Sequence, residues 1–204
     1  MPEKQTHQDK YFPATGMPDP DWWQGLWPDP LNTLKILGFR RGMVVVDLCC
    51  GDGLFTAPLS SLLEGQVIAI DLDPAMIKLA ELNVKTVGAP ECRWVVGDAR
   101  DLPQLITDPV DSVLIANTFH GVPEQAELSR SVSDILKPGG TFLIINWHHL
   151  SREETTVFGQ PRGPRTGMRM SPDDLKRVVE PSGLWLERIV ELPPYHYGAV
   201  FKKP

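Results

Sequence analysis

The sequence has few cysteines, no excess of positive charge and no long apolar run, and each absence excludes a class of protein. Three cysteines in 204 residues cannot form a disulfide framework. A formal net charge of −6 argues against broad nucleic-acid binding, which needs clustered cations. A membrane span would need a run of about eighteen apolar residues, and the chain has none. Since its first ten residues also lack an apolar signal-peptide core, we expect a cytoplasmic protein.

What is present is an alternation of short apolar runs with helix-like segments. Hydrophobic residues make up 42% of the chain and charged residues 23%, which is typical of a globular domain. The runs expected to form strands are 44–48, 67–71, 93–96, 111–116 and 141–145. Helices are expected over 30–37 and 55–63, from Pro74 to the break at Gly88, and over 124–136 and 171–179. Such an alternation predicts an α/β fold with a parallel sheet and right-handed crossovers.

The C-terminal part departs from this alternation. Two further strands, 184–192 and 195–202, are joined by Pro193 and Pro194 alone. So short a link cannot carry a crossover, so the pair must be antiparallel. No internal repeat or second domain is evident, and we expect a proline-rich arm and helical cap over 1–40 ahead of one domain over 41–204.

The first strand ends in a turn that contains glycine. Asp47 lies within that strand, and Gly51 and Gly53 follow it closely. Without a Cβ, glycine lets a backbone turn approach a ligand, and the next helix presents free N–H groups beside it. This arrangement predicts a nucleotide-type site at the carboxyl end of the strand.

Acidic residues end the next two strands as well. Asp71 is placed to accept hydrogen bonds from ribose hydroxyls, and Asp98 to accept one from an exocyclic amine. All these strand ends meet at one edge of a parallel sheet, where open α/β folds bind ligands. Three carboxylates at that edge disfavour a diphosphate and favour a ligand that carries a cation and an amino acid moiety.

Read together, these motifs resemble the class I S-adenosylmethionine-dependent methyltransferases. The resemblance covers residues 42–146 and rests on Val-Val-Asp-Leu-Cys-Cys-Gly-Asp-Gly, Ile-Ala-Ile-Asp-Leu-Asp-Pro, Gly-Asp-Ala-Arg-Asp-Leu-Pro and Leu-Lys-Pro-Gly-Gly-Thr-Phe. It implies a Rossmann-like three-layer sandwich whose seven-stranded, mostly parallel sheet ends in an antiparallel hairpin. The tail from Ser171 is similar to that of the small-molecule branch, which includes the ubiquinone and menaquinone biosynthesis methyltransferases.

The resemblance also implies roles for particular residues around S-adenosyl-L-methionine as cofactor. The implied cofactor-binding residues are Asp47, Cys49, Gly51, Gly53, Asp71, Leu72, Asp98, Ala99 and Asn117. Asp47 and the two glycines would hold the methionine part and Asp71 the ribose. Cys49 departs from the family pattern, since it stands where the first glycine of the motif is expected, and we expect it to fit only with a negative φ.

Candidate groups for the acceptor site follow the later strands. Histidine can take a proton near neutral pH, so we predict tentative catalytic roles for His120, His148, His196 and Tyr195 at the same rim. We expect no metal site, because His148 and His149 are adjacent and point apart on a strand. We expect the cysteines to be small packing residues rather than thiolates.

Two further segments leave alternatives open. Trp22, Trp23 and Trp27 either attach the N-terminal arm to the domain or cover a ligand. The glycine- and proline-rich stretch 150–170 carries four arginines, which either close over an anionic acceptor or are merely solvated: Arg152, Arg162, Arg165 and Arg169.

We therefore expect methyl transfer to a small-molecule partner, without nucleic acid, and the oligomeric state is left open. Methylation of RNA or protein is an alternative that the net acidity disfavours. A non-catalytic module that binds S-adenosylmethionine is another, suggested by the altered first motif.

Overall fold

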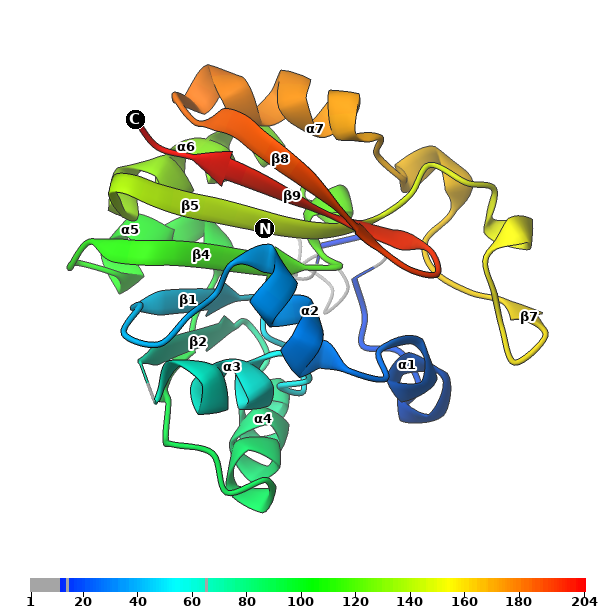
Figure 1. The fold of residues 1–204 in the computed structure, drawn as a ribbon, viewed down its shortest axis with the longest axis horizontal. Helices are drawn as coiled ribbons and strands as arrows, with labels where there is room; N and C mark the ends of the chain where they lie inside the picture. The colour runs from blue at the N-terminus through cyan, green and yellow to red at the C-terminus, as the bar shows by residue number, and fades with distance from the viewer. Residues whose placement is uncertain (1–11, 14, 65) are drawn as a thin grey trace, which may run out of the picture.

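The alternating runs form one seven-stranded sheet with helices against both faces (Figure 1). The computed structural model describes residues 12, 13, 15–64 and 66–204. The strands of this sheet are β1 (Val45–Leu48), β2 (Val67–Asp71), β3 (Arg93–Val96), β4 (Val110–Ala116), β5 (Leu136–Trp147), β8 (Trp185–Leu192) and β9 (His196–Lys202). Their spatial order is β3-β2-β1-β4-β5-β9-β8. The predicted fold class is confirmed.

The pairing directions also agree with the sequence. Strands β1 to β5 pair in parallel, and β9 runs antiparallel to both β5 and β8. The two-proline link therefore closes a hairpin, as its length predicted. Strand β5 begins earlier than expected, because Leu136 already pairs with Val110 before the register of the β4–β5 ladder shifts.

The helices are α1 (Pro20–Leu26), α2 (Pro30–Leu37), α3 (Thr56–Leu63), α4 (Pro74–Thr86), α5 (Leu102–Leu105), α6 (Gln125–Ile135) and α7 (Pro172–Val179). The side chain of Asp29 caps α2 by accepting a 2.9 Å hydrogen bond from Asn32 N, and Asp73 caps α4 in the same way. Ser171 and Asp174 form a reciprocal capping box on α7. Helices α1 and α5 were not predicted, and both are short.

Buried side chains form a core on each side of the sheet. On one face, α6 and α7 pack over Val46, Leu48 and their neighbours. On the other, α2 and α3 pack with the tryptophans of α1 over Val45 and its neighbours. Because both faces are covered, the central strands are mostly apolar, and the buried side chains of Asp47 in β1 and Ser112 in β4 are polar exceptions.

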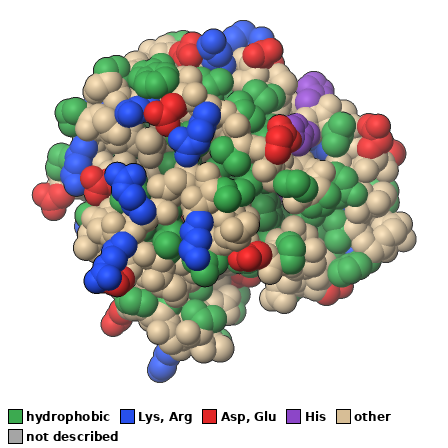
Figure 2. Space-filling view, in the orientation of Figure 1, with side chains coloured by type: hydrophobic (Ala, Val, Ile, Leu, Met, Phe, Trp, Pro, Cys, Tyr) green, Lys and Arg blue, Asp and Glu red, His purple; other side chains and the backbone are tan. Residues whose placement is uncertain are grey.

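The two ends of the parallel strands differ in charge and shape. Lysine and arginine side chains gather on the side where the strands begin, on the left in Figure 2. Figure 1 shows residues 150–170, in yellow, and α1, in dark blue, beyond the opposite ends of the strands. Within the part of the chain that the structure describes, no helix is both long and apolar enough to cross a membrane.

Candidate functional site

A cavity of about 840 Å³ lies at the carboxyl ends of β1 to β4. Its size is within the range of small-molecule sites. Three parts of the chain line it: the strand-end turns, the N-terminal segment from Phe12 to Trp23, and residues 150–170, which we call the arginine loop. Eight of the nine predicted cofactor residues line this one cavity, and Gly53 is the exception.

Asp47 is a buried carboxylate at the floor of the cavity. It is 2% exposed, and its Oδ2 accepts a 2.6 Å hydrogen bond from Thr56 Oγ1 at the start of α3. Burial raises the pKa of Asp47 to about 7, although the Thr56 hydrogen bond opposes the shift. Such a group gains from a nearby positive charge, since a cation would restore the ionised form.

The turn after β1 differs from the expectation at Cys49. Its φ is +60°, in the left-handed region, whereas a negative φ was expected. Gly51 and Gly53 follow with φ of +56° and +86°, so three residues of this turn are left-handed. Since glycine adopts this conformation without a Cβ penalty, the turn retains the backbone of a glycine at Cys49 while carrying a thiol.

Gly53 is needed for packing rather than for contact with a ligand. A Cβ added there would lie 2.8 Å from the Cα of Ala80, so the turn sits directly against α4. Of the two glycines, Gly51 lines the cavity and Gly53 is not among the residues that line it.

Asp71 connects the end of β2 to the turn after β1. Its Oδ2 accepts a hydrogen bond from Gly51 N and its Oδ1 one from Asp73 N, both at 2.9 Å. Burial raises the pKa of Asp71, and the two backbone hydrogen bonds oppose that rise. Each carboxylate oxygen has a second lone pair, so the group can still accept hydrogen bonds from a ligand.

Asp98, at the end of β3, has a partner that sequence reasoning missed. Arg100 donates to its carboxylate through both the backbone N and Nε, each at 2.9 Å, and these bonds lower the pKa of Asp98. The guanidinium of Arg100 also lies over the ring of Phe12, 5.7 Å from its centroid. The N-terminal segment is therefore in contact with this wall of the cavity.

Asn117 presents an unsatisfied amide to the cavity after β4. Its backbone has φ of +58°, and its N donates to Ile145 O at 2.9 Å. Its side-chain nitrogen and oxygen are both covered, and neither has a hydrogen-bond partner among the described residues. A buried amide without partners is costly, so this group fits a ligand with polar donors and acceptors, such as the amino acid end of S-adenosylmethionine.

Two of the three N-terminal tryptophans line the cavity, and the third packs in the core. Trp22 and Trp23 line the cavity and are 7% and 6% exposed, whereas Trp27 packs edge-on against Phe55 at 5.1 Å. Thus Trp27 attaches this segment to the domain, while Trp22 and Trp23 contribute to the wall of the cavity.

The arginine loop covers the cavity from the other side. It contains a short hairpin of β6 (Thr156–Val157) and β7 (Gln160–Pro161). Phe158 at the hairpin tip lies against Gly25 of α1, because a Cβ added to Gly25 would be 2.8 Å from the Phe158 ring. Helix α1 and the arginine loop are therefore in contact.

The predicted histidine cluster is not assembled at the cavity. Among the described residues, His120 is the histidine that lines it. His196 is 1% exposed and packs against Trp147, its register partner on β5, at 4.1 Å. Burial holds the pKa of His196 well below its usual value. His196 was expected at the rim of the cavity. Of this register pair, Trp147 lines the cavity and His196 does not.

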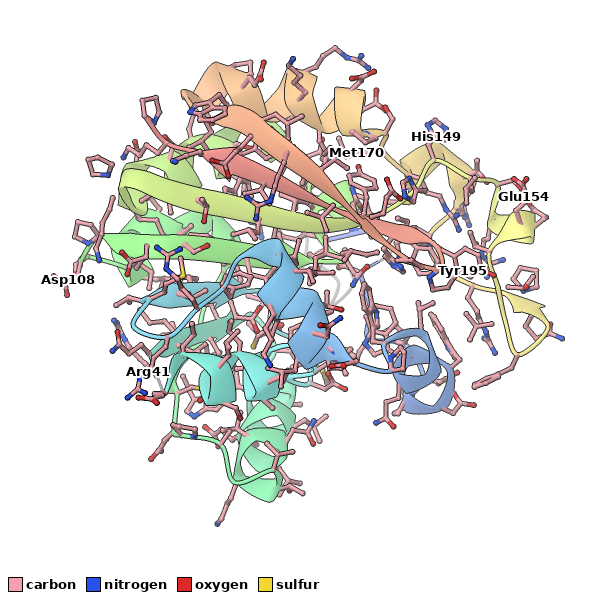
Figure 3. The ribbon with its side chains drawn as sticks, viewed as in Figure 1. Arg41, Asp108, His149, Glu154, Met170 and Tyr195 are labelled. Carbon is pink, nitrogen blue, oxygen red and sulfur yellow. The ribbon has the colours of Figure 1, made fainter. Side chains whose placement is uncertain are left out.

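The other two predicted catalytic residues have structural contacts. His148 Nε2 lies 2.9 Å from Glu191 Oε2. The hydroxyl of Tyr195 donates to Thr156 O at 2.8 Å and accepts from Thr156 N at 3.2 Å, so it holds the β6–β7 hairpin. Tyr195 lies at the β8–β9 end of the sheet, and His149 projects outward beyond β5 (Figure 3). None of these side chains is part of the cavity wall.

Comparison with protein-family models matches residues 45–140 to a model described as "Methyltransferase domain". Among curated proteins, the chain is 34% identical over 118 residues to the ubiquinone/menaquinone biosynthesis C-methyltransferase UbiE of Idiomarina loihiensis, covering 56% of this chain and 47% of that protein. It is 29% identical over 120 residues to the demethylmenaquinone methyltransferase of Lactococcus lactis, covering 58% of this chain and 47% of that protein. The chain thus spans about half the length of these curated relatives.

Solved structures resemble nearly the whole chain. An S-adenosylmethionine-dependent methyltransferase from Aquifex aeolicus is 25% identical with a TM-score of 0.75, covering 91% of this chain and 94% of that one. A magnesium protoporphyrin IX methyltransferase from Synechocystis with bound S-adenosylmethionine shares the fold, with 14% identity, a TM-score of 0.65, and coverage of 95% and 94%. The regions outside the family match therefore also follow this architecture.

Proposed function

Because the chain carries the domain of the class I S-adenosylmethionine-dependent methyltransferases, we propose that it transfers a methyl group to a small-molecule acceptor. The observation that carries the proposal is one cavity lined by strand-end residues from β1 to β4, with the unpartnered amide of Asn117 among them.

The acidic residues of the cavity would hold the cofactor. Asp47 and Asn117 would hold its methionine part, and Asp71 the ribose hydroxyls. Leu72 and the backbone of Ala99 would contact the adenine, with Asp98 at its edge.

When bound, the cofactor supplies a methyl group on a sulfonium, which is activated toward displacement. The chain's own contribution is to hold the acceptor in line with that group and to exclude water. Trp22, Trp23 and the arginine loop cover the cavity for this purpose. His120 lines the cavity and would take the proton of a protic acceptor, because neutral imidazole accepts a proton near pH 7.

The lining of the cavity favours a small acceptor over a macromolecule. The N-terminal segment and the arginine loop both line it, so a folded RNA or protein would have to insert a side chain or a base between them. The curated relatives are named for quinone biosynthesis, which also involves small molecules.

Calorimetry with S-adenosylhomocysteine, followed by an acceptor screen, tests the proposal. We expect binding, and after incubation with S-adenosylmethionine and a metabolite extract we expect a mass gain of one methylene in a small molecule. Failure to bind the cofactor product would refute the proposal, and a gain confined to macromolecules would refute the choice of acceptor.

The role of His120 has its own test. We expect His120→Gln to lower the turnover number at least tenfold, as loss of general base catalysis typically does, while leaving cofactor affinity unchanged. His149→Gln, at an exposed site outside the cavity, is the control. Equal losses of turnover and of affinity would assign His120 a structural role instead.

A further inference from the structure

We propose that the acceptor carries a carboxylate, bound by Arg152, Arg162 and Arg165 of the arginine loop, on a flat apolar body. The inference rests on the proposed function, since it concerns the acceptor of the same cavity. The proposed acceptor is an aromatic or similarly planar carboxylic acid.

The first observation is uncompensated charge. Arg152, Arg162 and Arg165 all line the cavity, and among the described residues none of them has a carboxylate within ion-pairing distance. Elsewhere in the described part of the chain, four of the five basic residues that line a second cavity at the opposite ends of the strands are paired with carboxylates, and Arg40 is the exception. Lys137 lies 2.8 Å from Asp111, and Arg188 and Lys202 both contact Glu187. The arginine loop therefore lacks the counter-ions that this protein supplies to its other basic cluster.

The second observation is that one of these guanidinium groups is fixed in place. Arg162 lies over the ring of Trp22, 5.1 Å from its centroid. Its Nε is covered and has no hydrogen-bond partner among the described residues. A stacked guanidinium with a free N–H is suited to bind a carboxylate, because its planar donors match the two carboxylate oxygens.

Arg169 explains how the loop keeps its shape around these groups. It is 3% exposed and lies over the Trp147 ring at 5.1 Å. It donates to Pro164 O at 3.1 Å and, through Nη2, to Thr155 Oγ1 at 2.7 Å. Arg169 thus holds the loop backbone and is not one of the residues that line the cavity.

The charge at the other end of the cavity selects the type of anion. Asp47, Asp52, Asp71, Asp73 and Asp98 all line the same cavity. A doubly charged phosphate would be repelled by these groups more strongly than a singly charged carboxylate would. The separation also orients the acceptor, with its anion at the arginine loop and its remainder directed toward the cofactor residues.

The walls near the arginine loop define the body of the acceptor. Trp22, Trp23 and Trp147 line the cavity together with Pro164. Trp147 is itself fixed, since it stacks on Tyr195 at an interplanar angle of 12° and a Cβ added to Gly163 would lie 2.9 Å from its ring. Rigid indole walls favour planar apolar groups.

Matched pairs of probes test the proposal in the 204-residue chain. Calorimetry would compare benzoate with benzamide, and 2-naphthoate with 2-naphthamide, with 2-naphthyl phosphate as a third arm, both with and without S-adenosylhomocysteine. We expect 2-naphthoate to bind about tenfold or more tightly than 2-naphthamide, because charge-assisted hydrogen bonds to arginine distinguish them. We expect Arg162→Gln and Arg165→Gln to remove that preference, and Arg130→Gln, at an exposed site on α6, to retain it.

The outcomes separate this inference from the proposed function. Equal affinity for acid and amide in both pairs, or a preference for the phosphate, would overturn the carboxylate assignment even if S-adenosylhomocysteine binds normally. Variants that lose S-adenosylhomocysteine affinity by the same factor would show that the arginines hold the cofactor instead. Failure of the wild type to bind S-adenosylhomocysteine would refute the proposed function, while an acid preference could still be measured.

Discussion

The two ends of the cavity are built differently. At the acidic end, carboxylates extend from strand termini and are held by backbone N–H groups, as Asp71 is by Gly51 and Asp73. At the arginine end, guanidinium groups extend from a loop and are held by indole rings, as Arg162 is by Trp22. The carboxylates of the first end follow the sheet, whereas the arginines of the second belong to a loop. This contrast fits the proposed function, in which the acidic end binds the cofactor and the arginine end binds the acceptor.

The largest effect is expected at the acidic end. Asp71→Ala removes the acceptor of two backbone hydrogen bonds and of the proposed ribose contacts, so we expect S-adenosylhomocysteine affinity to fall about 100-fold. Calorimetry measures the loss, with Asp108→Ala at an exposed loop position as the control. A loss of less than about threefold would show that Asp71 is a turn-stabilising residue alone.

The complementary change at the arginine end should separate the two functions. We expect Arg162→Ala to lower kcat/KM for the methyl acceptor about tenfold while leaving S-adenosylhomocysteine affinity unchanged, because the residue lies on the acceptor side. Steady-state kinetics and calorimetry on the same preparation provide both numbers. If cofactor affinity fell in parallel, the division of the cavity into two ends would be wrong.

A smaller effect is expected from pH. Burial raises the pKa of Asp47 to about 7, and a bound cation would lower it again, so cofactor binding should release a proton. Affinity for S-adenosylmethionine should therefore rise several-fold from pH 6 to pH 8, and Asp47→Asn should flatten this profile. Calorimetry in buffers of different ionisation enthalpy detects the released proton directly.

The same group makes stability depend on pH. The folded protein binds this proton more tightly than the unfolded chain, whose carboxyl keeps its ordinary pKa of 3.8. The free energy of unfolding should therefore fall as pH rises from about 4 to about 7 on account of Asp47. His196 contributes in the opposite direction, because its lowered pKa costs stability below its ordinary value of 6.5. Both proteins carry His196, so its contribution is removed when the free energy of unfolding of Asp47→Asn is subtracted from that of the wild type at each pH. The remaining pH dependence is that of the Asp47 carboxylate.

The smallest effect is expected at Cys49. Because its φ is +60°, Cys49→Gly should relieve strain and raise the free energy of unfolding by about 0.5–1 kcal/mol, with cofactor affinity changed less than about twofold. Chemical denaturation measures the change. Cys50→Gly is the matched control and should destabilise, since Cys50 is buried and outside the left-handed region.

Local sequence patterns were sufficient to predict the sheet, its antiparallel end and the strand-end residues that line the cavity. Each of these features follows from apolar periodicity or from a short link, and parallel strands bring their ends together automatically. The same reasoning explains why Asp47, Asp71 and Asp98 share one cavity although they are far apart in the chain.

The acceptor side could not be predicted in the same way, because it depends on contacts between distant segments. No local sequence pattern indicates that Arg162 lies over Trp22. Nor does one indicate that Trp147 lines the cavity while its register partner His196 does not. Likewise Cys49 adopts a conformation that its own side chain disfavours, because the turn between β1 and α3 imposes it.

The distribution of indole rings provides an optical signal. Of the six tryptophans in the chain, Trp22, Trp23 and Trp147 line the cavity, and Trp27 packs directly behind it against Phe55 and His196. Indole emission responds to the polarity and charge of its surroundings, so a ligand that displaces water there should shift the emission of the whole protein. Titration with unlabelled cofactor or acid can therefore be followed in the native chain, by its own fluorescence.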